Sequence, residues 1–195
     1  MTTFNINQFR SSIGNGGARP NQFMVSLSFP SFVPTASQAT QRAPFLIHNA
    51  TLPGLDMSPA TVLYRGREFH MTGDLVFQPM TIAFYNDDSM VLRTAFEQWV
   101  NGQENLIQKF GQTNPSAYMR DVDIYQLDRN GRVLKAYKLF DAFPINVGEV
   151  ALGFDMNSQV SSTTVTLRYQ TYTFSQSGGG VGINLGTNIG GSAQF

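Results

Sequence analysis

Near the C-terminus, two stretches of the 195-residue chain, 148–155 and 160–174, place apolar side chains at alternate positions. The apolar positions are Val150, Leu152, Phe154, Val165, Leu167 and Tyr169. A period of two is typical of a β-strand with one dry and one hydrated face. We therefore expect the stretches to pair as one long hairpin. Its second strand, of up to 15 residues, would far exceed the usual length of ~5–6.

The hydrated face of that second strand is chemically bland. It carries Thr164, Thr166, Arg168 and Gln170, with no cluster of acids, histidines or cysteines. Such a face is more typical of a structural element than of an active site.

Charge is sparse and balanced. Thirteen basic residues match thirteen acidic ones, and charged residues make up 13% of the chain, about half of the ~25% usual in soluble domains. A neutral, charge-poor surface tends to associate, so we expect much of it to be buried against copies of the same chain; a sparsely charged monomer is the alternative. The balance also disfavours tight nucleic-acid binding, which needs many unpaired Lys and Arg.

Several classes of site are disfavoured by composition. The absence of cysteine excludes disulfides, zinc–thiolate sites and thiol nucleophiles. The two histidines, His48 and His70, lie in different predicted elements, so no metal or other cofactor is expected. The acid pairs Asp87–Asp88 and Asp121–Asp123 could serve acid–base chemistry, but a helix cap and the hydrated side of a strand explain them better. We expect no enzyme activity.

Localisation signals are equally sparse. Residues 1–5 lack the basic and apolar regions of a signal peptide. No stretch approaches the ~20 apolar residues that span a bilayer. We expect synthesis and folding in the cytosol, without membrane insertion.

Most of the remaining pattern also predicts strands. We expect strands at 23–29, 45–50, 75–84 (with a bulge near Pro79), 121–127 and 132–140, a loop at 31–42, and a loop or irregular strand at 61–71. Asn130-Gly131 is a strong hairpin signal between the fourth and fifth of these strands. Residues 1–19 are interpreted as a flexible arm, 20–175 as the folded domain, and 176–195 as a flexible glycine-rich tail.

One segment has helical periodicity. Leu92, Phe96, Trp99 and Val100 fall on one face, Asp87 or Asp88 can cap the start, and Asn101-Gly102 can end the helix. With seven or eight strands and one helix, the chain is predicted to be an all-β sandwich or barrel with a helix plugging one side.

Residues 55–73 mix large apolar side chains with arginines and show weak periodicity. The residues concerned are Leu55, Met57, Tyr64, Arg65, Arg67 and Phe69. Because aromatic residues and Arg are enriched in interface cores, we expect this loop to contact another subunit; a plain surface excursion is the alternative.

Four segments together make the chain resemble the tail tube proteins of contractile-tailed (myovirus-type) bacteriophages. They are Ala18–Phe23 with its strand, Ala50–Gly54, Thr72–Trp99 with its Asn-Asp turn and Phe-x-x-Trp helix, and Phe143–Asp155 with the final strand. The resemblance spans roughly residues 18–174. The insert at 30–42 and the tail after Ser175 depart from shorter members and leave open a baseplate tube-initiator relative.

The resemblance implies a mainly β fold of two packed antiparallel sheets with one flanking α-helix. It also implies hexameric rings that stack into a tube inside the tail sheath, surround the tape measure protein, meet baseplate and tail terminator proteins, and conduct DNA. The protein would belong to the virion tail and assemble in the host cytoplasm. Thr164, Thr166, Arg168 and Gln170 would face the lumen, or alternatively the sheath.

Two rival functions remain. One is the tube of a secretion-system or bacteriocin-like contractile particle. The other is a monomeric β-sandwich that binds carbohydrate.

Overall fold

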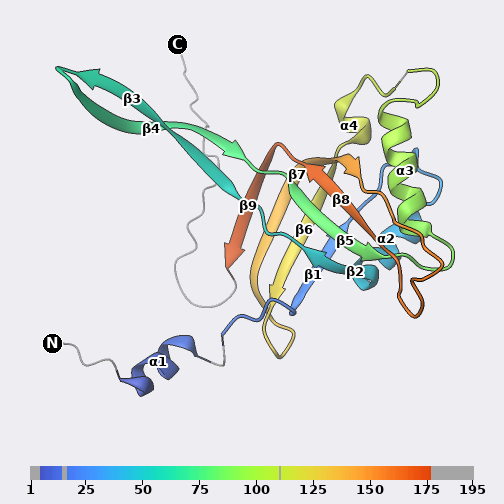
Figure 1. Ribbon diagram of the computed structural model, residues 1–195, viewed down its shortest axis with the longest axis horizontal. Coiled ribbons are helices and arrows are strands. Elements are labelled where there is room, and N and C mark those ends of the chain that lie inside the picture. Colours follow the sequence, from blue (N-terminus) through green and yellow to red (C-terminus); the bar gives the residue numbers. More distant parts are fainter. Residues whose placement is uncertain (1–4, 15–16, 110, 177–195) are drawn as a thin grey trace, which may run out of the picture.

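The computed structural model describes residues 5–14, 17–109 and 111–176 (Figure 1). These residues form four helices and nine strands: α1 (Ile6–Ile13), β1 (Phe23–Leu27), α2 (Ala36–Leu46), β2 (Ile47–Ala50), β3 (Leu55–Tyr64), β4 (Arg67–Phe77), β5 (Met80–Tyr85), α3 (Val91–Gln103), α4 (Pro115–Tyr118), β6 (Arg120–Leu127), β7 (Val133–Val147), β8 (Ser162–Arg168) and β9 (Thr171–Gln176). The predicted glycine-rich tail lies almost entirely outside the described residues.

The body is built from two antiparallel sheets that share the long strand β7. The first half of β7 pairs with β6 on one side and β9 on the other, and β1 extends this sheet beyond β6. The second half of β7 pairs with β8, which is followed by β5 and then β2. The predicted mainly β class with two antiparallel sheets is thus confirmed.

Strand β7 passes from one sheet to the other through a local bend. Asp141 has a positive φ of 55°, and the pairing register with β8 shifts between Pro144 and Asn146. On the facing chain β8 ends at Arg168 and β9 begins at Thr171, while Gln170 donates its backbone N–H to Phe140 O at 3.1 Å. The predicted long final strand is therefore two strands divided at the bend.

The prediction that residues 148–155 pair with that final strand was wrong. Residues 148–155 form no strand; the chain from 148 to 161 is a connection in which Leu152 and Phe154 are fully exposed. The last backbone bond of the pairing runs from Gly148 N to Thr164 O at 2.7 Å. The 15-residue β7 offers β8 and β9 far more buried partner surface than the short 148–155 run could.

Helix α3 closes the core, as predicted. Asp87 Oδ1 accepts a hydrogen bond from Val91 N at 3.1 Å, which satisfies a free donor at the helix start. Phe96 and Trp99 are fully buried, and they pack with Phe29 and Phe84 at centroid distances of 5.0–6.0 Å. The helix continues through the predicted stop at Asn101-Gly102 to Gln103.

A second helix replaces the loop predicted at 31–42. Ala39 and Ala43 of α2, one turn apart, are completely buried, and α2 packs on β1 and α3. Small side chains let a helix approach its neighbours closely, so this stripe of alanines acts as an apolar face despite its low hydrophobicity. The strand predicted at 45–50 consequently begins only at Ile47.

The predicted β6–β7 hairpin is confirmed, although its turn differs in type. Of the turn residues only Gly131 has positive φ, at 75°, whereas a type I′ turn needs two such residues. Asp128 Oδ1 instead accepts hydrogen bonds from Asn130 N at 2.7 Å and Arg132 N at 2.8 Å. The aspartate stabilises a type I turn followed by a glycine bulge.

One further expectation, a single bulged strand at 75–84, needs correction. The run at 75–84 is not one bulged strand, because Gln78-Pro79 separates β4 from β5, which belong to different sheets. The segment 1–19, expected to be a flexible arm, contains the helix α1, which is capped by Asn5, whose Oδ1 accepts a hydrogen bond from Asn7 N at 3.0 Å.

Candidate assembly surfaces

The segment predicted as a loop at 55–73 is a regular two-stranded hairpin that projects from the body (Figure 1). Its turn is Arg65-Gly66, with φ of 49° and 81°, the pair of positive values that a type I′ turn requires. The Arg65 guanidinium lies 5.5 Å from the centre of the Tyr64 ring. Arg-Gly was therefore the turn signal that the sequence interpretation missed.

A register shift between Met57 and Pro59 divides the hairpin into a basal and a distal part. A side chain on Gly73 would overlap the carbonyl oxygen of Ser58. The strands approach each other at this shift so closely that only glycine fits there.

The distal part has one mainly apolar face. The cross-strand pairs Ala60–Met71, Val62–Phe69 and Tyr64–Arg67 lie on it. The opposite face carries Thr61, Leu63, Glu68 and His70; His70 Nδ1 lies 3.0 Å from Thr61 Oγ1, and its Nε2 lies 3.8 Å from Glu68.

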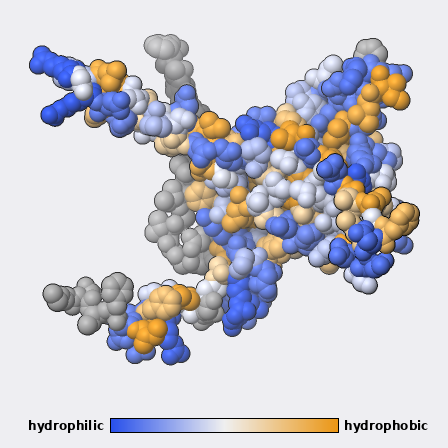
Figure 2. Space-filling view, viewed as in Figure 1, coloured by the Kyte–Doolittle hydropathy of each residue, from blue (hydrophilic) through white to orange (hydrophobic). Residues whose placement is uncertain are grey.

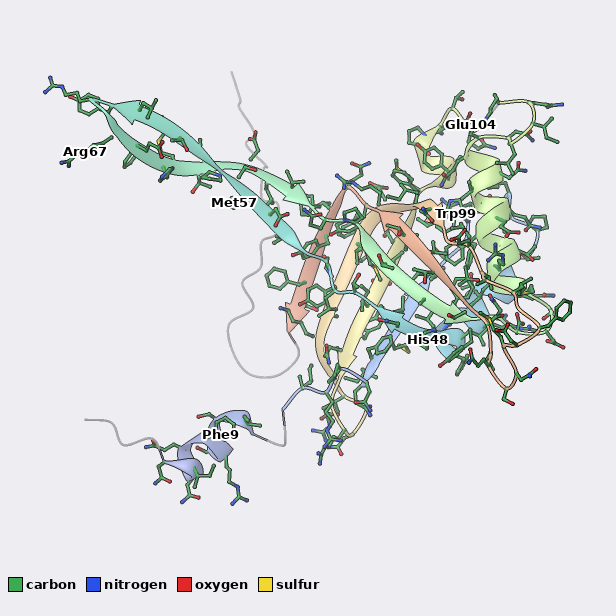
Figure 3. All side chains as sticks on the ribbon, viewed as in Figure 1. Phe9, His48, Met57, Arg67, Trp99 and Glu104 are labelled. Atoms are coloured by element: carbon green, nitrogen blue, oxygen red, sulfur yellow. The ribbon has the colours of Figure 1, made fainter. Side chains whose placement is uncertain are left out.

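Almost every side chain of the hairpin is exposed. Phe69 is 61% and Tyr64 67% accessible, and Figure 2 shows hydrophilic and hydrophobic residues mixed on the projecting hairpin. Figure 3 shows Arg67 at the tip and Met57 nearer the body. A two-stranded hairpin is marginal in water by itself, and the rest of the described chain leaves the side chains of this one exposed.

The second surface is the outer face of β8. Thr164 and Gln170 are exposed and Thr166 and Arg168 partly exposed, whereas Val165, Leu167 and Tyr169 are buried. Alternation thus divides the strand into a hydrated side and a core side.

The same outer surface continues onto β9 with a change of phase at the bend. Thr171, Thr173 and Ser175 are exposed, while Tyr172 packs against Tyr169 and Phe77 at 6.1 and 5.8 Å. The sequence interpretation missed these hydroxyl residues because it assumed one uninterrupted alternation.

Charges on this outer surface are partly paired. Lys138 lies opposite Thr173 on β9 and Asp123 on β6, and its Nζ is 3.2 Å from Asp121 Oδ2. The hydrogen bond and the charge of Asp121 raise the pKa of Lys138 above its ordinary value. The acid pair considered for catalysis thus lies beside a lysine on a solvated strand.

The other polar candidates have structural partners. His48 stacks on Tyr85 with ring centroids 4.1 Å apart. Burial opposes the charge of Asp87, but hydrogen bonds from Ser89, Val91 N–H and Arg42 together lower the pKa of its carboxyl. Within the described residues no three His, Asp or Glu side chains are grouped as metal ligands would be.

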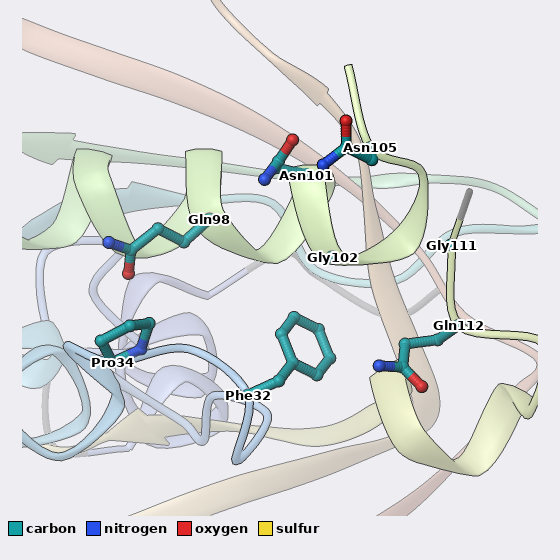
Figure 4. Close-up of a pocket in the computed structure, with 8 residues that line it drawn as sticks. All are labelled: Phe32, Pro34, Gln98, Asn101, Gly102, Asn105, Gly111 and Gln112. Atoms are coloured by element: carbon teal, nitrogen blue, oxygen red, sulfur yellow. The ribbon is translucent and has the colours of Figure 1, made fainter. Parts of the chain in front are cut away.

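A shallow groove of about 540 Å³ runs between α3 and the segments around residues 32–34 and 111–112 (Figure 4). It is lined by Phe32, Pro34, Gln98, Asn101, Gly102, Asn105, Gly111 and Gln112. The lining is rich in amides and contains no charged side chain. No described helix is long and apolar enough to cross a membrane.

Comparison with known proteins shows which family this chain belongs to. Residues 18–175 match the phage tail tube protein family. The tail tube protein of Serratia phage KSP90 is 31% identical over 169 residues, which cover 84% of this chain and 93% of the relative. Tail tube protein gp19 of Enterobacteria phage T4 is 28% identical over 154 residues, covering 77% and 87%.

Solved structures agree on the fold. A chain in the cryo-EM structure of the anti-feeding prophage baseplate superposes with a TM-score of 0.61 at 15% identity, over 83% of this chain and 97% of that one. The extended sheath–tube complex of an extracellular contractile injection system (PVC) gives 0.58 at 18% identity, covering 85% and 97%. On the family match and these relatives, the chain belongs to the phage tail tube proteins.

Proposed function

We propose that this protein forms rings, by expectation of six subunits, that stack into the inner tube of a contractile phage tail and conduct DNA. The family match and the two phage relatives support the tube role. The main structural support for assembly is the projecting β3–β4 hairpin, whose apolar face is left exposed by the described residues of the chain. A component of a repeating assembly can leave such a face open because each copy covers its neighbour.

A protein that forms the tail tube would have four expected partners. The tube would lie inside the sheath, begin at the baseplate, end at the tail terminator and enclose the tape measure protein during assembly in the host cytoplasm. The sheath–tube and baseplate structures that share this fold support the first two contacts by analogy. The role itself is structural, without catalysis.

The hairpin would supply subunit-to-subunit or ring-to-ring contacts, through the predicted residues Leu55, Met57, Tyr64, Arg65, Arg67 and Phe69. Because β3 and β4 pair along most of their length, removing only residues 56–62 would leave β4 without a partner strand. Replacing residues 59–72 with Asn-Gly shortens both strands together. The shortened subunit should fold but no longer polymerise in negative-stain images, with the parental chain as control; long tubes formed by the shortened chain would place the contact elsewhere.

We assign the hydrated face to the lumen. Thr164, Thr166 and Gln170, continued by Thr171, Thr173 and Ser175, present hydroxyls and amides that hold water with little attraction for phosphate, and Arg168 is the one cation among them. DNA must slide along such a wall, and a wall rich in unpaired cations would hold it. The neighbouring lysine, Lys138, is paired with Asp121, which fits this requirement.

The lumen assignment is tested by adding charge. Thr164→Lys with Thr166→Lys adds two positive charges per subunit, and DNA ejection from such particles should slow at low salt and recover at high salt, because phosphate contacts release counterions. The control, Ser37→Lys with Gln41→Lys, adds equal charge at exposed positions of α2. If particles that carry Thr164→Lys and Thr166→Lys assemble and eject DNA normally at both low and high salt, this face lies toward the sheath instead.

Two other roles remain as alternatives. Structural likeness also extends to contractile injection systems, but the identity to phage proteins is higher and favours the phage tail over such a particle or a tube-initiator relative. A monomeric carbohydrate-binding module would use the amide-lined groove beside Phe32. Micrographs of the purified protein decide against that module if they show rings or tubes.

A further inference from the structure

Helix α1 carries an apolar stripe that the described part of the chain leaves exposed. Ile6, Phe9 and Ile13 fall on one side of the helix and are 67%, 59% and 44% exposed, and no residue of α1 is buried. The helix lies before residue 18, outside the part of the chain that matches the family. The family match therefore does not explain its role.

The helix is encoded locally but is too short to be stable unaided. Asn5 caps its start, and Gly14, with φ of 66°, ends it. Eight residues fall below the ~12–15 that an isolated helix needs in water. A helix with clear end signals and a bare apolar stripe is typical of one that is completed by a partner.

The dimensions of the stripe match the distal hairpin. From Ile6 to Ile13 the helix axis advances about 10 Å at ~1.5 Å per residue. From Ala60 to Tyr64 strand β3 advances about 13 Å at ~3.3 Å per residue. Both faces are apolar, both are exposed, and both belong to elements that are marginal alone.

The two hollows on the described surface fit the stripe less well. The groove along α3 is lined mainly by amides. An apolar stripe packed there would remove water from these amides and offer them no hydrogen-bond partner. The hollow at the C-terminal end of α1 is bordered by Asp128, Arg129 and Asn130 and reaches only Ile13. Neither would cover Ile6 and Phe9.

We propose that α1 of one subunit packs its Ile6–Phe9–Ile13 stripe on the Val62–Phe69 face of the β3–β4 hairpin of a neighbouring subunit. Figure 3 places Phe9 and Arg67 far apart on the same side of one chain, with both elements hanging clear of the body. Elements that overhang one copy reach the next in a repeating assembly, and every copy supplies one helix for one hairpin. This inference rests on the proposed tube function.

The absence of cysteine makes the contact testable by disulfide formation. Chains with Phe9→Cys and chains with Val62→Cys are mixed, assembled and oxidised, and a linked dimer of one chain of each kind is expected. The matched controls are Ser11→Cys and Thr61→Cys, on the polar sides of the same elements, which should give little of this product. A chain with both Phe9→Cys and Val62→Cys reports contact within one subunit.

The outcomes separate the two proposals. A linked mixed dimer supports the contact, whereas a disulfide formed only within the doubly substituted chain, or none at all, overturns it. Micrographs of the same samples read the tube function independently: tubes without the mixed dimer refute the α1 contact alone, and the mixed dimer without rings or tubes refutes the tube function alone. In addition, Phe9→Ser should weaken assembly while Ser11→Ala leaves it unchanged.

Discussion

Replacing Trp99 with alanine should remove much of the stability of the folded subunit. The indole is fully buried, lies nearly parallel to the Phe96 ring at 6.0 Å and meets the edge of Phe29 at 5.5 Å. Its Nε1–H donates a hydrogen bond to Tyr118 O at 2.8 Å. One side chain thus joins α3 to the core and to the segment that leads into β6.

The expected cost has two parts. Truncating a large buried aromatic side chain to alanine costs ~3–5 kcal/mol through lost burial and a cavity, and the carbonyl of the partly buried Tyr118, left without its donor, adds up to about 1 kcal/mol. For a domain of this length 1 kcal/mol shifts Tm by ~2–4 °C, so the Trp99→Ala subunit should melt roughly 10 °C or more below the parent. Trp99→Phe keeps most of the apolar volume but loses the hydrogen bond, so its Tm should lie between the Tm of Trp99→Ala and that of the parent.

Equilibrium unfolding in urea, followed by far-ultraviolet circular dichroism, measures these differences. Fluorescence cannot serve, because Trp99 is the single tryptophan. The samples must be dilute enough to remain unassembled, since assembly would add its own stability. A change in the free energy of unfolding below about 1 kcal/mol for Trp99→Ala would refute the packing argument.

Three further predictions concern the polar and backbone features. Asp87 has a lowered pKa in the folded state, so its stabilising effect is present above the unfolded value of about 3.9 and is lost as pH falls through the folded value; Asp87→Asn should destabilise at pH 7 and differ less from the parent in acid, as measured by denaturation at both pH values. Gly73→Val should force the two hairpin strands apart beside Ser58 and reduce hydrogen-exchange protection of β3 and β4, whereas unchanged protection would contradict the close approach. Asp121→Asn with Asp123→Asn should leave the fold and tubes intact in micrographs, and a hydrolase activity that vanished in this variant would overturn the structural role.

Local signals were sufficient for several elements because the residues that decide them are neighbours in the chain. The periodic run from Leu92 to Val100 and the Asp87 cap identified α3. The alternating runs on either side of Asn130-Gly131 identified the β6–β7 hairpin. In both cases the turn or cap and the buried face lie within one short segment, so tertiary structure had little to change except the exact ends and the turn type.

The sequence was less informative where small or exposed residues carry the structure. Helix α2 buries Ala39 and Ala43, which give a weak periodic signal although they permit close packing. Among the described residues the β3–β4 hairpin exposes both of its faces, so its sequence carries no alternation between a buried and a hydrated side. Its regularity could have been suspected only from the Arg65-Gly66 turn.

The sequence by itself determined the mainly β class, the α3 helix, the alternation of the hydrated β8 face and the resemblance to tail tube proteins. Only the tertiary structure decided which strand pairs with which. Residues 148–155 and 133–147 both alternate, and local pattern cannot rank them as partners for β8 and β9. The longer strand wins because it can bend between two sheets and bury both halves of its length, an advantage that exists only once segments distant in the chain are packed together.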